Sequence, residues 1–171
     1  MTTHVPQTLR HADIAQLIPH QADMCLLESV SAWDDQQIFC NATSHRSASH
    51  PLRAYGRLGA SCGIEYAAQA MAVHGALIAQ SPLNAASKAA GAPKAGYLVS
   101  VRGVTLHVER LDDLSAALTI HAERFMGDAG TIVYSFAVHA EFKLLLSGRA
   151  TVVLDAPLLA PETASITRSN P

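Results

Sequence analysis

Alternating apolar and polar positions dominate the second half of the chain. Residues 118–122 and 132–138 alternate strictly, which is the period of a half-buried strand. Further strands are predicted over Gly103–Leu111 and over Lys143–Leu154. The apolar residues 104, 106 and 108 stand at even positions, whereas the apolar residues 97, 99 and 101 before them stand at odd positions. The parity changes at Gly103, which predicts a β-bulge. The pattern therefore indicates at least four antiparallel strands in succession.

The first half contains a segment with a different pattern. Leu58 to Gln80 lacks proline, is rich in alanine and carries apolar residues all round, which predicts a long helix buried on every side. Before it, the sequence predicts a short helix over Asp13–Ile18 and two strands over Leu26–Ser31 and Gln37–Thr43. This order predicts an α+β fold in which an antiparallel sheet curls around one central helix.

Length and composition narrow the class of protein. The 171 residues fit one domain over residues 1–160, followed by a flexible polar tail over 161–171, and residues 81–95 read as a surface loop. The net charge of −2 gives no electrostatic footprint for nucleic acid. The apolar runs are too short to span a membrane, and the N-terminus lacks the apolar stretch of a signal peptide, so we expect a cytoplasmic protein. The three cysteines have no CxxC spacing, so we expect neither disulfides nor a metal site.

A polar stripe runs along the otherwise apolar helix. Ser61, Glu65 and Gln69 are spaced four residues apart, so they lie on one face. A carboxylate on a buried helix is costly unless it has a partner or a task. The stripe indicates that Glu65 is a general acid or base, while the alternative is that it faces a groove or a partner subunit and is merely solvated.

The loop before this helix supplies the other candidate groups. His50 can lean over the start of the helix as an acid or base, although most of the nine histidines must be inert; His20 is expected to cap a turn and His45 to be solvated. Unpaired N–H groups at Gly59 and Ala60 can hold an oxyanion, and the small Gly63 can let a substrate approach. Three arginines, Arg46, Arg53 and Arg57, can receive an acidic partner or phosphate, or can be scattered solvated charges.

Two segments resemble the bacterial 3-hydroxyacyl-(acyl carrier protein) dehydratases of the hotdog fold. Ile14 to Val30 is similar to their opening, a short helix followed by Leu-Pro-His and a strand, and Gly63 to Ala70 is similar to their helix motif, an acidic residue followed four positions later by Gln. The similarity extends over roughly Asp13 to Leu154 and is greatest to a divergent branch linked to aryl polyene pigment clusters.

The resemblance implies roles for particular residues. In that family a loop histidine removes the C2 proton of a 3-hydroxyacyl thioester, a helix carboxyl group helps the C3 hydroxyl to leave, and backbone N–H groups polarise the thioester carbonyl. These roles fall on His50, Glu65 and the Gly59/Ala60 region, with Gly63 and Gln69 beside the substrate. His50 stands fifteen positions before Glu65, where the family usually has fourteen, and is followed by Pro-Leu instead of Phe-Pro.

The resemblance also implies partners. Hotdog domains pair their edge strands, so we expect a homodimer at least, which can bring His50 and Glu65 together, or a hetero-oligomer with a paralogous dehydratase. The substrate arrives on the phosphopantetheine of an acyl carrier protein, which docks on Arg46, Arg53 and Arg57, and no cofactor of the protein's own is expected. Two other functions stay open: a catalytically silent subunit that binds acyl chains or stabilises an active paralogue, and a hotdog thioesterase.

Overall fold

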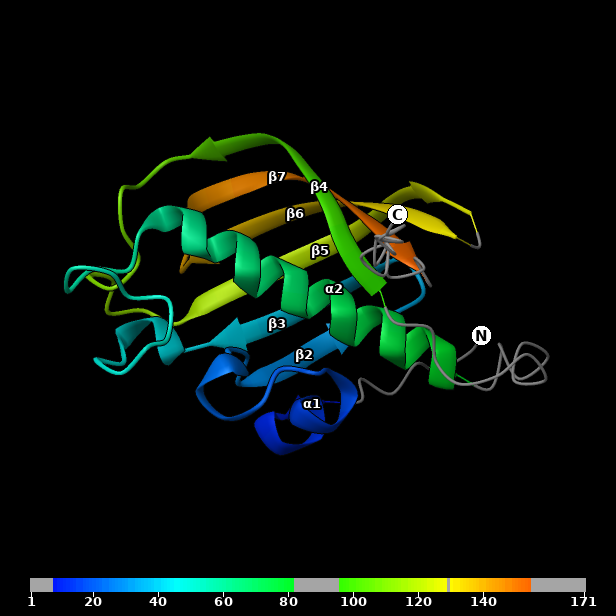
Figure 1. Ribbon diagram of the computed structural model, residues 1–171, viewed down its shortest axis with the longest axis horizontal. Helices are drawn as coiled ribbons and strands as arrows, with labels where there is room; N and C mark the ends of the chain where they lie inside the picture. Colours follow the sequence, from blue (N-terminus) through cyan, green and yellow to red (C-terminus); the bar gives the residue numbers. More distant parts are fainter. Residues whose placement is uncertain (1–7, 82–95, 129, 155–171) are drawn as a thin grey trace, which may run out of the picture.

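A computed structural model describes residues 8–81, 96–128 and 130–154 of the chain. One seven-stranded antiparallel sheet curls around one long helix, α2 (Gly63–Gln80) (Figure 1). The remaining elements are listed in chain order: β1 (Leu9–Arg10), α1 (His11–Leu17), η1 (Ala22–Met24), β2 (Ser29–Trp33), β3 (Gln37–Ala42), η2 (Ser44–Arg46), η3 (Ala60–Cys62), β4 (Gly96–Leu106), β5 (Leu118–Gly127), β6 (Thr131–Ala140) and β7 (Lys143–Leu154). This is the hotdog fold expected from the sequence.

The strands lie in the order β1-β2-β3-β5-β6-β7-β4, so the four strands after α2 form one half of the sheet. The parity change at Gly103 is a bulge, because the register between β4 and β7 shifts between Arg102 and Thr105 and Gly103 has a φ of +59°. β4 ends at Leu106, five residues before the predicted end, because the chain then turns back toward the start of α2. Residues 82–95 of the loop expected over 81–95, and the tail over 161–171, lie outside the described residues.

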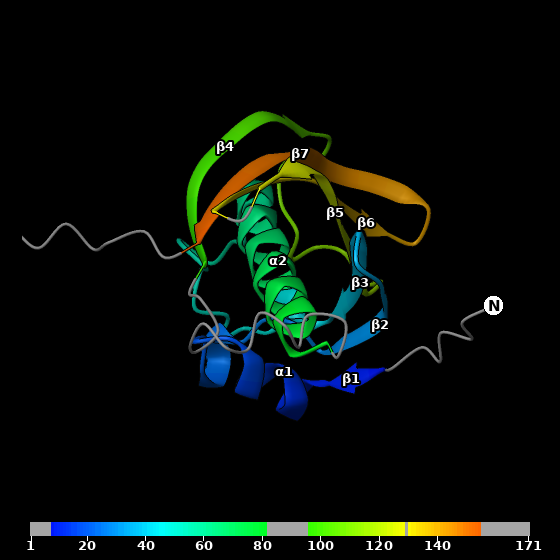
Figure 2. The ribbon, with the colours of Figure 1, turned by 90° about the vertical axis from the view of Figure 1, so that its right-hand side faces the viewer.

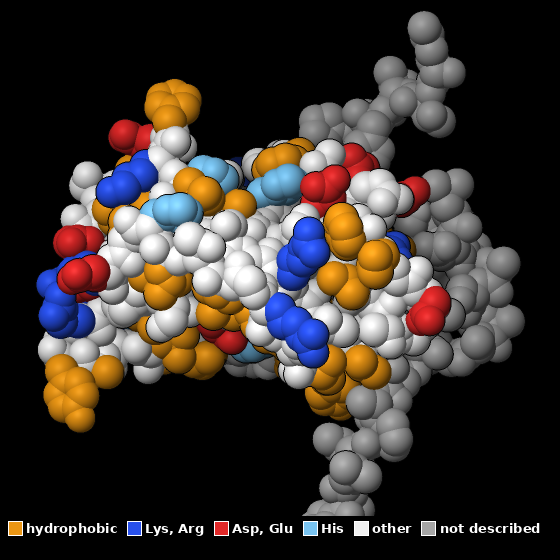
Figure 3. Space-filling model, turned by 90° about the horizontal axis from the view of Figure 1, so that it is seen from above, with side chains coloured by type: hydrophobic (Ala, Val, Ile, Leu, Met, Phe, Trp, Pro, Cys, Tyr) orange, Lys and Arg blue, Asp and Glu red, His pale blue; other side chains and the backbone are white. Residues whose placement is uncertain are grey.

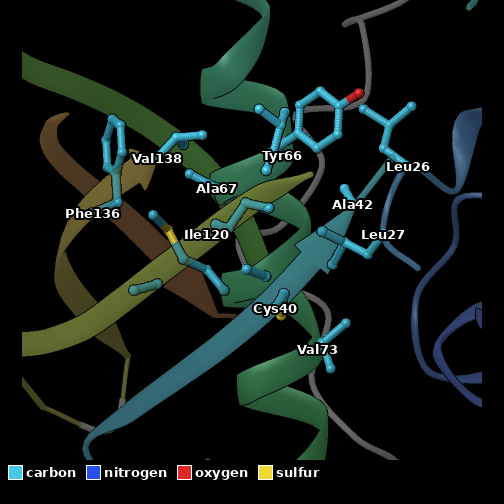
Figure 4. Close-up of a cluster of buried hydrophobic side chains, with 14 of the residues drawn as sticks. Leu26, Leu27, Cys40, Ala42, Tyr66, Ala67, Val73, Ile120, Phe136 and Val138 are labelled. Carbon is cyan, nitrogen blue, oxygen red and sulfur yellow. The ribbon is translucent and has the colours of Figure 1, made fainter. Parts of the chain in front are cut away.

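The core lies between α2 and the concave face of the sheet. In Figure 2 the sheet arches over α2 and continues down its right-hand side, and α1 lies beneath the helix. Side chains from α2, from the strands and from the segment before β2 meet in one cluster, including Leu26, Tyr66, Val73, Ile120 and Val138 (Figure 4). The alternating residues of β5 and β6 thus point at α2, as their period predicts.

The helix differs from its prediction in two ways. It begins at Gly63 instead of Leu58, because Leu58 and Ala60 form extended-chain hydrogen bonds with the segment after β4: Leu111 N–H donates to Leu58 over 2.8 Å, and Ala60 N–H donates to the Glu109 carbonyl over 3.0 Å. Within the single chain it is also not buried on every side, since Ala72 and Ala79 are exposed and Ala68 is partly exposed. Small residues line this open face.

A buried histidine joins α2 to the sheet. His74 is fully buried, its Nε2 lies 2.7 Å from the carbonyl of Asp34, and its Nδ1 lies 3.0 Å from the hydroxyl of Tyr134. Because a carbonyl can only accept, the neutral ring carries its proton on Nε2, and Tyr134 donates to Nδ1. His45 is buried as well, against the carbonyl of Leu114, and the expectation that it is solvated was wrong. No helix among the described residues is long and apolar enough to cross a membrane.

Candidate active site

The carboxylate of Glu65 is held on the first turn of α2 through one of its two oxygens. Oε1 accepts a hydrogen bond from Gln69 Nε2 at 2.9 Å and lies 3.1 Å from Nε2 of His20. Within the described part of the chain, no hydrogen bond reaches Oε2. The side chain is 30% exposed, so the carboxylate is not buried in the single chain as the sequence analysis assumed.

Gln69 has a fixed orientation, because two backbone groups of opposite polarity bind its amide. Its Oε1 accepts from the N–H of Leu26 at 2.9 Å, and its Nε2 donates to the carbonyl of Met24 at 2.7 Å. The second N–H of the same amide therefore has to point at Glu65. Of the predicted stripe of Ser61, Glu65 and Gln69, the contact between Glu65 and Gln69 is confirmed, whereas Ser61 lies in η3 before α2 and is exposed. Since both amide N–H groups are taken and the side chain is fully buried, contact of Gln69 with substrate stays a prediction.

His20 comes to Glu65 from the segment that follows α1. Pro19 ends that helix, and Ile18 before it has extended backbone angles, as the sequence predicted. Gln21 then fastens the segment back onto α1 by donating to the carbonyl of Ala15 at 2.9 Å. From the sequence, His20 was expected only to cap a turn. The signal that could have found it is a histidine placed directly after a helix-ending proline, in a segment that resembles the dehydratase opening.

His50 also lies beside α2, where it is buried, but it contacts different residues. The N–H of Leu52 donates to its Nδ1 at 3.1 Å, so the proton of the neutral ring is on Nε2. Nε2 then donates to the hydroxyl of Tyr66 at 3.0 Å, and burial lowers the pKa of His50, with Arg53 and His45 adding to the effect. Neither ring nitrogen has a free lone pair in this arrangement.

The chain of hydrogen bonds from His50 continues to the backbone. Ser44 Oγ donates to the carbonyl of Leu26 at 2.8 Å, so the hydroxyl of Tyr66, 2.8 Å away, must donate to Ser44. The structure thus brings His50 to Tyr66, and Glu65 to His20. A contact between His50 and Glu65, including one across a dimer, stays a prediction.

The residues expected to hold the thioester carbonyl are partly engaged elsewhere. The N–H of Ala60 is bonded to Glu109, as described above. Gly63 is buried, and a Cβ placed there would overlap the side chain of Leu146 on β7, so its small size serves the packing of helix on sheet. Gly59 is partly exposed and lines a shallow hollow of about 430 Å³, together with Ser61 and Cys62. Of these three positions, Gly59 is the one that a substrate can approach directly.

The three loop arginines have different surroundings. Arg46 donates to the carbonyl of Ser115 at 2.8 Å, and Arg53 donates to the carbonyls of Ser47 and Gly56 and to the carboxylate of Asp112. Arg110 also binds Asp112, and this contact together with the N–H of Leu58 holds the pKa of the carboxyl group well below its usual range. Arg57 is exposed, and its side chain makes no hydrogen bond or ion pair with the described residues. It lines both the 430 Å³ hollow and a neighbouring one of about 450 Å³ that also includes Lys143.

The curled sheet around one helix, with a carboxylate held at the start of that helix, defines a hotdog-fold protein. The chain belongs to the ApeP-like family, described as ApeP dehydratase, whose profile matches residues 12–160. This confirms the divergent dehydratase branch indicated by the sequence. No curated protein matches the chain.

Solved structures show the same fold at low sequence identity. The dehydratase heterocomplex ApeI:P from Xenorhabdus doucetiae is 21% identical, with a TM-score of 0.68 over 90% of this chain and 93% of that chain. A thioesterase from Haemophilus influenzae is 16% identical, with a TM-score of 0.58 over 92% and 97% of the two chains. A hypothetical thioesterase from Streptococcus pneumoniae with coenzyme A is 13% identical, with a TM-score of 0.51 over 73% and 83%. These similarities establish the fold, which hosts both chemistries.

Proposed function

We propose that the protein removes water from a 3-hydroxyacyl thioester carried by an acyl carrier protein, in fatty acid or aryl polyene/polyketide-type synthesis. The observation that carries this proposal is the carboxylate of Glu65, with Oε1 held by Gln69 and His20 and Oε2 on a partly exposed face, without a hydrogen bond to the described residues. Membership of a family described as ApeP dehydratase supports the same reaction class.

The reaction needs one proton to leave C2 and one to reach the departing hydroxyl. Breaking the C2–H bond gives the proton to a base and leaves an enolate, the C3–O bond then breaks as the C2–C3 double bond forms, and the hydroxyl takes a proton and departs as water. Oε2 of Glu65 has the free lone pairs to take up or return such a proton. A role for His50 as the base remains a prediction, because it requires the ring to exchange its proton and release Tyr66.

The test is a dehydration assay with a 3-hydroxyacyl group on a carrier protein. We expect wild-type protein to form the enoyl thioester and Glu65→Gln to lower the turnover by ~10²-fold or more, since a positioned general acid or base contributes 10²–10⁴-fold. Glu123→Gln is the matched control, because Glu123 is an exposed glutamate on β5. The absence of dehydration in a folded wild-type protein, with every acyl length tried, would reject the proposal.

A second candidate function is a silent subunit that stabilises an active paralogue. The observation that favours it is the commitment of both ring nitrogens of His50 to Leu52 and Tyr66. The same assay separates this function from the first, because a silent subunit has no turnover alone but raises the activity or stability of the dehydratase with which it is mixed. Release of free thiol from the substrate would indicate the thioesterase alternative instead.

The substrate would be delivered near the start of α2, beside Arg57 in the loop that precedes the helix. A carrier protein is acidic, and Arg57 with Lys143 gives cationic side chains around the two hollows. The phosphopantetheine then comes with the carrier, so the chain needs no cofactor of its own. We further propose that the edge strand β4 pairs with a second hotdog domain, either a second copy or a paralogous dehydratase.

A further inference from the structure

The segment between α1 and β2 places an imidazole against the carboxylate on which the proposed function depends. We propose that His20 is a positioning residue: its Nε2–H donates to Oε1 of Glu65, 3.1 Å away, and thereby keeps Oε2 directed at the substrate. The catalytic consequence of this inference rests on the proposed function, whereas the contact between His20 and Glu65 rests on the geometry alone.

The segment that carries His20 is fixed at both ends. Before it, the N–H of Ile18 donates to the carbonyl of Ile14 in α1 over 3.3 Å, and directly after His20 the side chain of Gln21 donates to the carbonyl of Ala15 in the last turn of that helix. After it, Gln69 binds the carbonyl of Met24 and the N–H of Leu26, and the ring of His11 lies 2.7 Å from the carbonyl of Leu27. A side chain on so constrained a backbone loses little entropy when it forms a hydrogen bond, which is the condition for a rigid supporting contact.

Both donors reach the same oxygen of Glu65. Gln69 approaches Oε1 from one turn further along α2, and His20 approaches it from a different segment. Two N–H groups from separate elements fix the plane of the carboxylate, whereas Gln69 alone would leave it free to rotate about the Oε1 contact. Oε2 accepts from no donor in the described part of the chain, and it therefore retains the lone pairs that a proton transfer uses.

The surroundings of His20 specify its tautomer. Its Nδ1 is buried and has no hydrogen-bond partner among the described residues. A buried N–H without an acceptor is costly, so the proton belongs on Nε2, where Glu65 accepts it. Because Nδ1 is buried, His20 does not exchange protons with solvent through that nitrogen and acts through Glu65 instead.

The test compares two substitutions of similar polarity and different reach. The amide of glutamine places an N–H near the position of Nε2 of histidine, and the shorter asparagine reaches only the position of Nδ1. We expect His20→Gln to keep turnover within ~10-fold of wild type and His20→Asn to lower kcat by ~10²-fold with little change in KM, since misplacement by about 1 Å costs about that factor. Equal losses in both variants, with folding verified by circular dichroism, would overturn the positioning role.

A second readout does not depend on activity. Long-range ¹H–¹⁵N spectra of wild-type protein should show the Nε2–H tautomer of His20, with an Nε2 proton whose downfield shift is lost in Glu65→Ala and kept in Glu123→Ala. A proton on Nδ1, or a shift that ignores Glu65, would overturn the inference. If wild-type protein has no dehydratase activity but the spectra agree, the proposed function fails while the contact stands.

Discussion

Tyr66 lies between His50 and Ser44, accepting from the imidazole at 3.0 Å and donating to the serine hydroxyl at 2.8 Å. Burial raises the pKa of Tyr66 to about 12, so the phenol stays protonated and keeps this direction. These hydrogen bonds hold His50 against the side of α2 that packs on the segment before β2. Tyr66 directly follows Glu65, which carries the candidate carboxylate.

Removing this phenol should destabilise the protein. Tyr66→Phe leaves the Nε2–H of the buried His50 without an acceptor, and an unpaired buried group costs about 1–3 kcal/mol. Urea unfolding followed by circular dichroism measures the change. Tyr97→Phe on the exposed part of β4 is the control and should leave the free energy of unfolding almost unchanged. A wild-type midpoint in Tyr66→Phe would show that His50 does not depend on this contact.

Two glycines of α2 should respond in opposite directions to the same substitution. A Cβ at Gly63 would overlap Leu146, so Gly63→Ala should cost ~1–3 kcal/mol through overpacking. Gly75 has nothing within 4 Å of the position of a Cβ, so Gly75→Ala should gain up to about 1 kcal/mol from helix propensity. Thermal and urea unfolding of the two variants measure the difference. A stable Gly63→Ala protein would mean that β7 does not pack on the helix start as described.

Acid should destabilise the fold through its buried histidines. Burial lowers the pKa of His74 below its ordinary value of 6.5, with Arg124 adding to the effect, and burial also lowers the pKa of His45 and of His50. Above pH 6.5 these rings are neutral in both the folded and the unfolded chain. As the pH falls below that value, the unfolded rings bind protons and the folded rings resist, so the free energy of unfolding decreases.

The measurement is the urea midpoint at about pH 7.5 and about pH 5.5, which bracket the titration of an unperturbed histidine. We expect the lower midpoint at the lower pH. His74→Gln is less stable at both values but should lose less between them, because one of the titrating rings has been removed. An equal loss in wild type and variant would exclude His74 as a contributor.

Charge reversal should have different effects at two of the three loop arginines, Arg57 and Arg53. Arg57→Glu should raise KM for a carrier-bound substrate and leave a short pantetheine thioester unaffected, because a free surface charge acts mainly on association. Arg53→Glu should instead lower the stability, since it places a carboxylate against that of Asp112. Steady-state kinetics on both substrates, together with thermal unfolding, measure the two effects. Equal kinetic effects of Arg57→Glu on the two substrates would argue against carrier docking there.

The edge strand β4 should be covered by a partner. Its residues Tyr97, Leu98 and Val99 are all at least 38% exposed, so successive apolar side chains are open on a strand that has β7 as its one partner among the described residues. Apolar side chains are exposed on this side of the molecule, above β4 and β7 (Figure 3). We expect light scattering to give at least twice the 18.1 kDa mass of one chain.

Val99→Glu should shift that assembly toward single chains or abolish mixing with a paralogue. Phe142→Glu is the matched control, because Phe142 is fully exposed in the turn between β6 and β7, away from the free edge. A wild-type protein that stays at 18.1 kDa alone and in the presence of a paralogous dehydratase would contradict the prediction.

The sequence predicted the fold well because its signals are local. Strict alternation over residues 118–122 and 132–138 specifies strands regardless of what they pack against, and the parity change at Gly103 marks a bulge from neighbours alone. The start of α2 was missed because Leu58 bonds to Leu111, more than fifty positions away. Helix propensity cannot report a competing partner so distant in the chain.

The candidate site was predicted less completely for a related reason. The i, i+4 spacing placed Gln69 against Glu65, a contact within one helix. The sequence paired Glu65 with His50 and assigned His20 only to a turn, whereas in the single chain it is His20 that contacts Glu65. The choice depends on a backbone turn after Pro19 and on the bond from Leu52 to His50, and neither is visible as a residue pattern.

Leu26 has a consequence for how the sequence can vary among relatives. Its N–H is taken by Gln69 and its carbonyl by Ser44, so the backbone of one apolar residue joins the hydrogen bonds of Glu65 to those of His50. Loss of the Ser44 or Gln69 side chain leaves a backbone group of Leu26 without its hydrogen-bond partner, and the apolar side chain of Leu26 cannot replace that partner. Residues 44 and 69 should therefore each keep a side chain that can form its bond during evolution, whereas residue 26 itself can vary among aliphatic side chains.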